Sequence, residues 1–314
     1  MTEICTSCTN SVFEEAWWLD TVAPGKWREA TVKEGDKVIA RLPYYYDNGV
    51  ITNPVYTQTM GIWMDDSLKS CSKGNSQLHR QKEIIFELLE QLPKTKRISM
   101  ILDHNTSYIL PFRWAGFRIE PTFSYRIKGV NLIDPKEDLF GKTVKKNIKA
   151  ASRGVSIDEN TSDFSVLLDM QNRTYARQHR KNPIREDITR KVMESAYRHG
   201  HGKLLIARGE DGVPHSAGFF LFDERTCYYL LGGFDPAFNS DGSQNLLLDA
   251  GIRFAQSVSA DFDFEGSMVE GIENFYRQFG GSQVINYQVS KQLFVYEMFD
   301  VLKPRIKKLI GYKI

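Results

Sequence analysis

The sequence predicts an α/β (α+β) protein made of two tandem domains, each a mixed β-sheet flanked by helices. Helical and strand-like periods of apolar residues alternate along the whole chain. A glycine turn, a helix, a strand, a second helix and a last strand occur in the same order in both halves. The length of 314 residues also suits two domains, because a domain usually has about 100–200 residues.

The first half contains short elements and one strong amphipathic helix. Apolar residues from Leu78 to Leu92 recur at helical spacing, and Pro93 ends the pattern. The expected elements are a helix at 14–22, a strand hairpin at 27–32 and 37–46, the amphipathic helix, a strand at 97–102, a short helix at 108–115 and a strand at 118–127. A loop through Asn53, Gly61 and Trp63 separates the hairpin from the amphipathic helix.

The second half has more elements, and their order constrains the sheet. We expect helices at 139–152, 164–179, 188–199, 246–258, 272–279 and 298–314, and strands at 155–157, 204–207, 216–222, 226–231, 261–265 and 284–289. The strands between residues 204 and 231 are joined by tight turns and must be antiparallel. The strand–helix–strand unit from 226 to 265 should cross over right-handed, so that its two strands are parallel.

The repeat and a break in the pattern suggest where the domains meet. Gly116 and Gly280 each end the second helix of the repeated unit. Between Gly129 and Pro135 the hydrophobic pattern is interrupted by turn-forming residues. We therefore expect an N-terminal domain of residues 1–133, joined by the C-terminal helix 298–314, and a C-terminal domain of residues 134–297.

The composition indicates an ordinary globular protein of a reducing compartment. Hydrophobic residues make up 41% and charged residues 25% of the chain, and the net charge is +2, so any attraction to a polyanion must be local. No apolar run approaches the ~20 residues of a membrane span, and no secretory signal is recognisable, so we expect a cytoplasmic protein. Cys5 and Cys8 lack the second cysteine pair of a zinc ribbon, which favours free thiols and no metal.

The chemistry is expected at the end of the strand 261–265. Asp263 and Glu265 should share one strand face, where two carboxylates can push one pKa upward and suit it to proton transfer. Tyr228, on the neighbouring strand, could hydrogen-bond a substrate. The alternatives are an exposed acidic edge or a helix cap for the carboxylates, and packing for the tyrosine. No nucleophile elbow with a histidine partner is recognisable, which favours direct attack over a covalent acyl-enzyme.

Two further features are suited to a negatively charged substrate. Gly242, Ser243 and Gln244 form a turn that opens a helix, and free backbone N–H groups at such a point suit phosphate or carboxylate. A second set of residues forms a basic surface on two successive helices and comprises Lys145, Lys146, Lys149, Arg153 and Arg177. Such a surface could contact a polyanion such as tRNA, and the alternative is a solvated helix face.

Several motifs resemble a known family. They are Asp263-Phe264-Glu265-Gly266-Ser267-Met268, the following Gly271-Ile272-Glu273-Asn274-Phe275-Tyr276, the segment Leu231-Gly232-Gly233-Phe234-Asp235, Asn53-Pro54 with Gly61-Ile62-Trp63, and the basic stretch Lys145-Lys146-Asn147-Ile148. Together with the element order, they resemble the Fem-type, methicillin-resistance-protein-like peptidyl- or acyltransferases of the GCN5-related N-acetyltransferase (GNAT) superfamily. The resemblance covers nearly the whole chain and implies two tandem GNAT-like domains.

The resemblance also implies a function. A Fem-like protein would be an acyl- or aminoacyltransferase that moves an acyl group to an amine, in cell-wall or surface-polysaccharide biosynthesis. The donor would be either aminoacyl-tRNA or acyl-coenzyme A, and the acceptor a small molecule or cell-wall precursor. Asn53, Gly61, Trp63 and Ser267 would line the substrate cleft.

Two alternative functions stay open. The first is a coenzyme A-dependent N-acetyltransferase, although the turn before the central helix departs from the usual Arg/Gln-x-x-Gly-x-Gly/Ala pattern. Asn239 leads this turn, Gln244 ends it, and Asp241 adds a negative charge where a pyrophosphate would sit. The second is a non-catalytic binding module for a polyanionic or saccharide ligand. The sequence does not define an oligomeric state.

Overall fold

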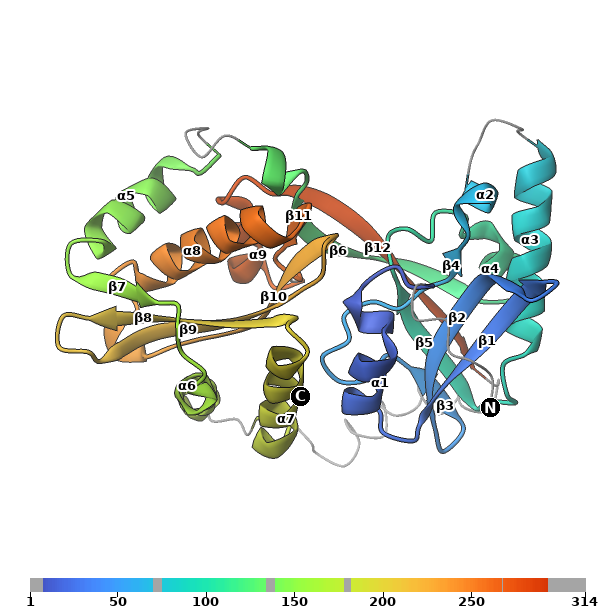
Figure 1. The fold of residues 1–314 in the computed structure, drawn as a ribbon, viewed down its shortest axis with the longest axis horizontal. Helices are drawn as coiled ribbons and strands as arrows, with labels where there is room; N and C mark the ends of the chain where they lie inside the picture. Colours follow the sequence, from blue (N-terminus) through green and yellow to red (C-terminus); the bar gives the residue numbers. More distant parts are fainter. Residues whose placement is uncertain (1–7, 70–74, 134–138, 178–181, 267, 293–314) are drawn as a thin grey trace, which may run out of the picture. The chain divides into compact units, whose positions relative to one another are not determined.

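The computed structural model describes residues 8–69, 75–133, 139–177, 182–266 and 268–292 (Figure 1). Contacts within the chain divide it into two compact units, residues 1–122 with 286–314 and residues 123–285. The division falls inside the strands β6 (Arg118–Ile127) and β12 (Ser282–Gln292), and not in the loop near residues 129–135. Each of these two long strands therefore contributes one part to each unit.

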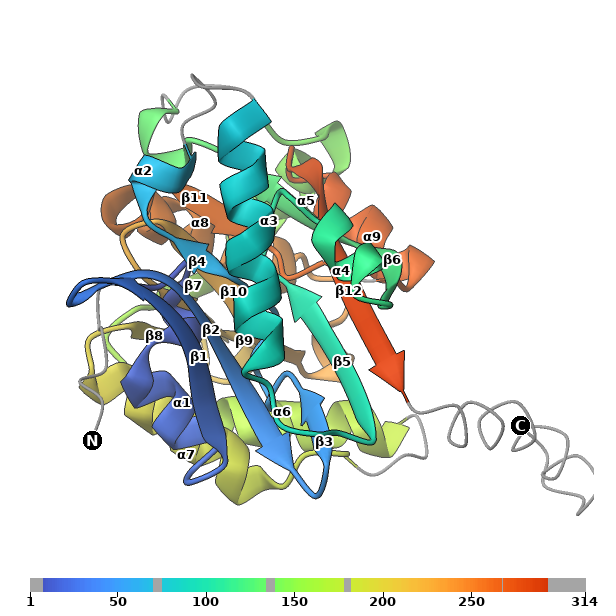
Figure 2. The same cartoon turned by 90° about the vertical axis from the view of Figure 1, so that its right-hand side faces the viewer.

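The first unit is a mixed sheet with a helix on each side. Its elements are η1 (Val12–Glu14), α1 (Ala16–Val22), β1 (Trp27–Glu34), β2 (Lys37–Asp47), β3 (Val50–Thr52), β4 (Trp63–Met64), α2 (Asp66–Lys69), α3 (Asn75–Glu90), β5 (Arg97–Leu102) and α4 (Leu110–Trp114). The strand order is β1-β2-β3-β5-β12, and β4 pairs with β2. The long helix α3 packs on β1 and β2, and α1 lies on the other side of these strands (Figure 2).

A buried glutamate connects the start of the chain to the loop before β4. Glu14 is fully buried and accepts hydrogen bonds from the N–H of Asn10 at 2.7 Å and the N–H of Gly61 at 2.8 Å. Burial, and then the neighbouring charge of Asp103, raise the pKa of Glu14 to about 7. Arg41, which is 1% exposed, donates to the carbonyl oxygen of the same glutamate. The hydrogen bonds of Glu14 and Arg41 therefore hold the N-terminal residues of this unit against the loop before β4.

The second unit has most of the sheet that the element order predicted, but the strand beside β11 is β6 of the first half, whereas β12, which contains the expected strand 284–289, pairs with β5. Its elements are η3 (Val130–Leu132), α5 (Lys142–Ala151), β7 (Val155–Asp158), α6 (Phe164–Arg177), α7 (Glu186–Arg198), β8 (Gly202–Gly209), β9 (Pro214–Phe222), β10 (Thr226–Phe234), η4 (Pro236–Phe238), α8 (Ser243–Val258), β11 (Asp261–Asp263) and α9 (Glu270–Arg277). The strand order is β6-β11-β10-β9-β8-β7. The strands β8, β9 and β10 are antiparallel, and β10 and β11 are parallel across the α8 crossover, which confirms the expected directions of the strands.

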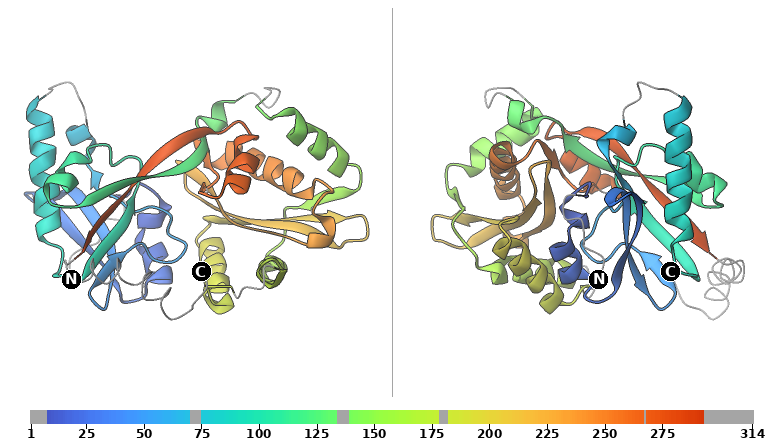
Figure 3. Two further views of the ribbon diagram at one scale, coloured as in Figure 1. Left: turned by 180° about the vertical axis from the view of Figure 1, so that it is seen from behind. Right: turned by 45° about the vertical axis from the view of Figure 1, so that its right-hand side comes forward.

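Helices cover both faces of this second sheet. The helices α5 and α8 lie on one face, and α6 and α7 lie on the other (Figures 1 and 3). Between α8 and the sheet lies an apolar core in which aromatic side chains such as Phe220, Phe262, Phe264 and Phe279 are almost completely buried. Burial of a large aromatic side chain contributes about 2–3 kcal/mol to folding, so this core sets the position of β11 firmly.

The structure agrees with most of the expected elements and corrects a few. The strands β5 and β6 have the expected bounds. The strand β11 ends at Asp263 and not at residue 265, because Glu265 and Gly266 adopt left-handed backbone angles. The short elements β3, β4 and α2 were not expected. The expected helix at 298–314 lies outside the described residues.

The cysteines meet the expectation only in part. Cys227 is a free and fully buried thiol, and burial raises its pKa well above the ordinary value. Cys8 is disulfide-bonded, so the expectation of a free thiol is wrong for this residue. Cys5 and Cys71 lie outside the described residues. In the described part of the chain, no helix is both long and apolar enough to cross a membrane.

Replacing Glu14 by glutamine should remove a pH-dependent loss of stability. The carboxyl group has a pKa of 4.5 in its reference state and about 7 in the folded unit. The folded state therefore binds the proton more tightly, and this stabilisation is complete below pH 4.5 and lost as the pH rises towards 7. Over this range the free energy of unfolding of the wild type should fall by about 3 kcal/mol more than that of the Glu14→Gln variant.

Urea titrations at several pH values measure this difference. Glu87→Gln, on the exposed side of α3, is a matched control that should keep the pH dependence of the wild type. A Glu14→Gln variant with the same pH dependence as the wild type would contradict the role assigned to the buried carboxyl group.

Candidate active site

The strand β11 ends in a left-handed turn. The strand pairs in parallel with Thr226–Tyr228 of β10 and antiparallel with Arg126 and Ile127 of β6. The next residues leave the sheet, because Glu265 has a φ of 58° and Gly266 a φ of 60°. A positive φ is uncommon for a glutamate, and strain of this kind is concentrated at functional sites. The turn therefore marks the end of β11 as a candidate site.

The two parallel strands in the middle of this sheet separate at the same point. β10 continues to Phe234, whereas its pairing with β11 stops at Tyr228. Ligands of sheets with parallel strands commonly bind beyond the carboxyl ends of those strands. Glu265 lies two residues beyond the end of the shorter strand, which is where such a ligand would bind.

The carboxylate of Asp263 supports the turn. The hydroxyl of Ser124 and the backbone N–H of Glu265 both donate to its Oδ1 atom, the latter at 2.7 Å. Arg126 Nε donates to Oδ2 at 2.5 Å, and both partners of this ion pair are buried, at 3% and 2% exposure. A buried carboxylate with these donors is suited to holding the chain in place.

Glu265 has a different electrostatic environment from Asp263. Its Oε1 atom is buried, and burial raises the pKa of the carboxyl group well above its usual value. The negative charge of Asp263 raises this pKa further, and the positive charge of Arg126 opposes the shift. A carboxylate with a raised pKa is a stronger base than an exposed one and is better matched to proton transfer near neutral pH.

One tyrosine side chain lies beside this carboxyl group, and a second tyrosine contacts the first. Tyr276 of α9 stacks on Phe264 with 5.3 Å between ring centroids, and burial together with the charge of Glu265 raises its pKa to about 12. Tyr229 of β10 contacts Tyr276 edge to face at 6.2 Å, and burial raises the pKa of Tyr229 too. Both hydroxyl groups therefore stay protonated at neutral pH and can donate a hydrogen bond to an oxyanion.

The structure brings together the three residues that the sequence suggested for catalysis. Tyr228 is the Cα partner of Asp263 in the sheet, and its ring lies 5.7 Å from Cζ of Arg126. Glu265 is joined to Asp263 by the hydrogen bond of the turn. The expectation that Asp263 and Glu265 share one strand face is wrong, because β11 ends before Glu265. Their catalytic roles stay predictions.

The turn before α8 is filled by groups of the protein itself. The carboxylate of Asp241 accepts the N–H of Ser243 at 2.8 Å and also contacts Nδ1 of His215 at 2.6 Å. A Cβ atom at Gly242, which has a φ of 82°, would lie 2.5 Å from the carbonyl oxygen of Asn147 in α5. An acidic side chain thus occupies the position that an anion would take, next to Gly242, Ser243 and Gln244. The role of these three residues in donor binding stays a prediction.

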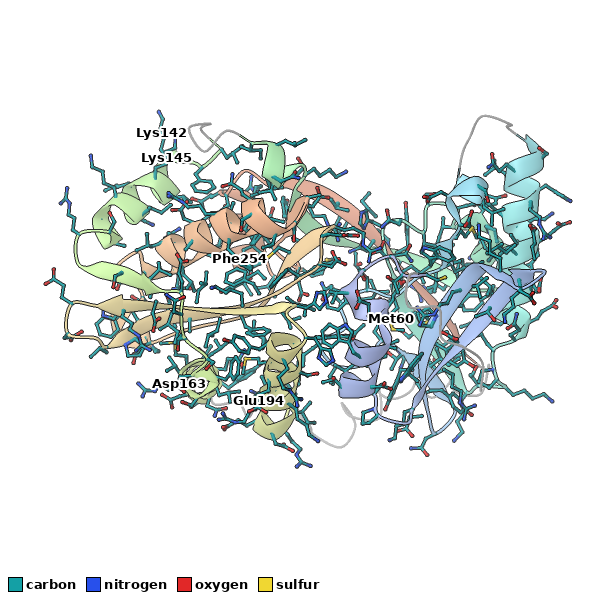
Figure 4. All side chains as sticks on the ribbon, viewed as in Figure 1. Met60, Lys142, Lys145, Asp163, Glu194 and Phe254 are labelled. Atoms are coloured by element: carbon teal, nitrogen blue, oxygen red, sulfur yellow. The ribbon has the colours of Figure 1, made fainter. Side chains whose placement is uncertain are left out.

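The predicted basic surface lies along α5. Lys146, Lys149 and Arg153 are exposed, as is Lys142 at the start of the helix, whereas Lys145 is partly buried. Lys142 extends away from the fold above α5 (Figure 4). In the described part of the chain, these four exposed cations form no ion pair with an acidic residue. The side chain of Arg177 and the residue Ser267 lie outside the described part.

The predicted residues of the first unit have structural contacts. The side chain of Asn53 donates to the carbonyl oxygen of Ile101 at 3.3 Å and accepts the N–H of Ile101 at 2.8 Å, which continues the pairing of β3 with β5. A Cβ atom at Gly61 would lie 2.5 Å from Oγ1 of Thr106. Trp63 lies in β4 and is partly exposed. A role in substrate binding stays a prediction for all of these residues.

Sequence reasoning missed the partners on the neighbouring elements. Ser124 and Arg126 were read only as part of a strand, although their spacing puts both on one face of β6. Tyr276 was predicted only as part of the helix 272–279 and of the family motif. Among the described residues, no group of three or more His, Cys, Asp or Glu side chains is placed to hold a metal ion.

Comparisons with known proteins agree with this architecture. The family model of the acetyltransferase (GNAT) domain matches residues 140–267, which include the α8 crossover, β11 and Glu265. No curated protein sequence matches the chain.

Several solved structures share the fold over most of the chain. The structure of FemX has a TM-score of 0.66 at 12% identity, with 94% of this chain and 95% of that chain covered. The C-terminal domain of a putative lysylphosphatidylglycerol synthetase from Agrobacterium fabrum has a TM-score of 0.56 at 10% identity, with coverages of 93% and 91%. A tandem GNAT protein from the clavulanic acid biosynthesis pathway has a TM-score of 0.52 at 10% identity, with coverages of 88% and 86%.

These similarities confirm the expected fold class. The protein has the Fem-type fold of tandem GNAT-like domains, with a mixed sheet and flanking helices in each unit. At identities of 10–12%, the similarity to the solved structures establishes the fold alone.

Adding a methyl group at Gly266 should disturb the turn. A Cβ atom there would lie 2.3 Å from the carbonyl oxygen of Phe123, and the residue has a φ of 60°. Gly266→Ala should therefore lower the free energy of unfolding by about 1–3 kcal/mol. Gly271→Ala in α9 is the control, because no atom lies within 4 Å of its Cβ position. Equal stabilities of the two variants in urea titrations would contradict a tightly packed turn.

Proposed function

We propose that the protein is an acyl- or aminoacyltransferase that moves an acyl group from an activated donor to an amine, with Glu265 as the proton acceptor. The observation that carries the proposal is the carboxyl group of Glu265, which has a raised pKa and lies on a left-handed turn at the end of β11. The match of residues 140–267 to the acetyltransferase domain supports this reading, because Glu265 lies within the matched segment.

The proposed reaction is a direct attack. The amine nitrogen forms a bond to the acyl carbon, and the bond from that carbon to the oxygen or sulfur of the donor breaks. Glu265 takes the proton that the nitrogen loses and passes it to the leaving oxygen or sulfur. In this proposal, the hydroxyl group of Tyr276, beside Glu265, stabilises the negative oxygen of the intermediate.

The acceptor in this proposal is an amine on a small molecule or a cell-wall or surface-polysaccharide precursor. Support comes from the fold shared with FemX. The fold is also shared with a putative lysylphosphatidylglycerol synthetase, whose name describes the formation of an aminoacyl product. Transfer of an aminoacyl group is therefore a chemistry that this fold accommodates.

Two observations favour aminoacyl-tRNA over coenzyme A as the donor. The carboxylate of Asp241 accepts the N–H of Ser243 at the start of α8, and a second negative charge from a pyrophosphate would be repelled there. Lys142, Lys146 and Lys149 of α5 and Arg153 just after it are exposed cations that could contact the phosphates of a tRNA. Acyl-coenzyme A is the alternative donor.

Replacing Glu265 by glutamine should slow the transfer with little change in the affinity for the donor. Loss of a general base typically costs 10²–10⁴-fold in rate, so we expect kcat to fall by about that factor. In the wild type, the rate should rise with pH through the raised pKa of Glu265, because only the ionised carboxylate accepts a proton. Glu265→Gln should lose this limb of the pH profile.

The assay is release of the acyl group from a mixed aminoacyl-tRNA pool, or from acetyl-coenzyme A, in the presence of a panel of amines. Glu270→Gln on the exposed side of α9 is the matched control and should keep the wild-type rate and pH profile. Transfer at the wild-type rate by Glu265→Gln would rule out Glu265 as the proton acceptor.

Reversing two charges on α5 should weaken the binding of aminoacyl-tRNA. The double variant Lys146→Glu with Lys149→Glu should lower the affinity and reduce the slope of log K against log salt by about 1 for each lost phosphate contact. Lys191→Glu, on the exposed face of α7, is the control. Wild-type affinity and slope in the double variant would exclude α5 as the tRNA-binding surface. A thermal shift with acetyl-coenzyme A and none with tRNA would favour the alternative donor.

A further inference from the structure

Two side chains of β6 contact Asp263, and the proposed chemistry gives neither of them a role. Ser124 is 1% exposed and Arg126 is 2% exposed. They are two residues apart on an extended strand, so both project from the same face of the sheet. The antiparallel pairing places the Cα atom of Arg126 opposite that of Asp263. Both side chains therefore reach the carboxylate of Asp263 from the neighbouring strand β6.

Arg126 compensates the charge of the buried Asp263 carboxylate. A carboxylate removed from water is costly unless a cation and hydrogen-bond donors replace the solvent. Arg126 supplies the cation at 2.5 Å, and Ser124 and the N–H of Glu265 supply the donors. The ring of Tyr228, 5.7 Å from Cζ of Arg126, limits where the guanidinium can go. Hydrogen bonds to an ionised acceptor are stronger than neutral ones, so the charge also strengthens the bond to Glu265.

The bond from the N–H of Glu265 to Asp263 holds the backbone from which the Glu265 side chain projects. The N–H of Glu265 can reach Oδ1 of Asp263 because the backbone has turned into the left-handed region. If the carboxylate moved or lost its charge, the backbone of Glu265 would lose the acceptor that offsets its strained angle. The position of the Glu265 carboxyl group therefore depends on residues of a different strand.

We infer that Arg126 and Ser124 are positioning residues for Glu265, and that they act through Asp263. The inference rests on the proposed function only in that Glu265 is the proton acceptor. The dependence of the Glu265 turn on β6 is a property of the folded chain and can be measured without substrate.

The charges around Glu265 predict how the pKa of its carboxyl group should change when Asp263 is replaced. Among the described residues, Asp263 opposes the ionisation of Glu265, Arg126 favours it, and the phenol of Tyr276 is the other titratable group that interacts with its charge. Asp263→Asn removes the opposing negative charge and leaves the positive charge of Arg126. The pKa of Glu265 should therefore fall, and the acid limb of the pH–rate profile should move to lower pH.

The first measurement follows the carboxyl group of Glu265 directly. Infrared difference spectra during a pH titration, with the Glu265→Gln variant as reference, report the ionisation of Glu265 in the absence of substrate. We expect this ionisation at lower pH in Asp263→Asn than in the wild type. An unchanged titration in a folded Asp263→Asn variant would overturn the inference.

The second measurement uses a milder variant that keeps the ion pair. Ser124→Ala removes one donor to Oδ1 of Asp263 and should lower kcat about 10- to 100-fold with little change in KM, since small misplacement of a catalytic group has effects of this size. Ser156→Ala, on an exposed position of β7 in the same unit, should keep the wild-type kcat. If Asp263→Asn does not fold, Ser124→Ala is the variant that tests the inference. A wild-type kcat in Ser124→Ala would overturn the inference in that case.

The outcomes for the proposed function and for this inference are distinct. A fully active Glu265→Gln variant, together with a shifted titration of Glu265 in Asp263→Asn, would end the proposed function and support the positioning role. An inactive Glu265→Gln variant, together with wild-type kcat and pH profile in both Ser124→Ala and Asp263→Asn, would support the proposed function and end the positioning role.

Discussion

The buried ion pair between Arg126 and Asp263 is the interaction on which the rest of the candidate site depends. It joins β6 to β11, and it keeps a charge inside the sheet that water cannot reach. Because an unpaired carboxylate would be costly there, the two residues and the donor Ser124 have to stay together. The ionised carboxylate then holds the N–H of Glu265, and the chain turns out of the sheet at that residue.

The same environment gives two neighbouring carboxyl groups different properties. Asp263 has a cation and two hydrogen-bond donors, so its charge is compensated. Glu265 lies in the field of that charge and next to the aromatic core that contains Phe264 and Tyr276. An apolar surrounding with a low dielectric strengthens every such interaction. The aromatic core therefore does more than stabilise the fold, because it also raises the basicity of one carboxylate beside an ionised one.

Much of the fold could be predicted from local patterns, and the site could be predicted only in part. The hydrophobic periods of β5 and β6 gave their bounds correctly, and the α8 crossover gave the parallel pairing of β10 with β11. The left-handed turn could not be predicted, because the alternation of polar and apolar residues continues through Glu265 after the strand has ended. Arg126 was missed because its partner Asp263 is 137 residues away in the chain.

The two units differ in how the chain supplies their strands, and this affects the order in which they can form. Residues 123–285 make up one unit from a continuous stretch, whereas the other takes β12 from beyond residue 285. In that unit β12 lies beside β5, so during synthesis the edge of β5 stays unpaired until β12 has emerged from the ribosome. An exposed strand edge is a template for aggregation. Nascent chains that stall before Ser282 would therefore need a chaperone to protect β5.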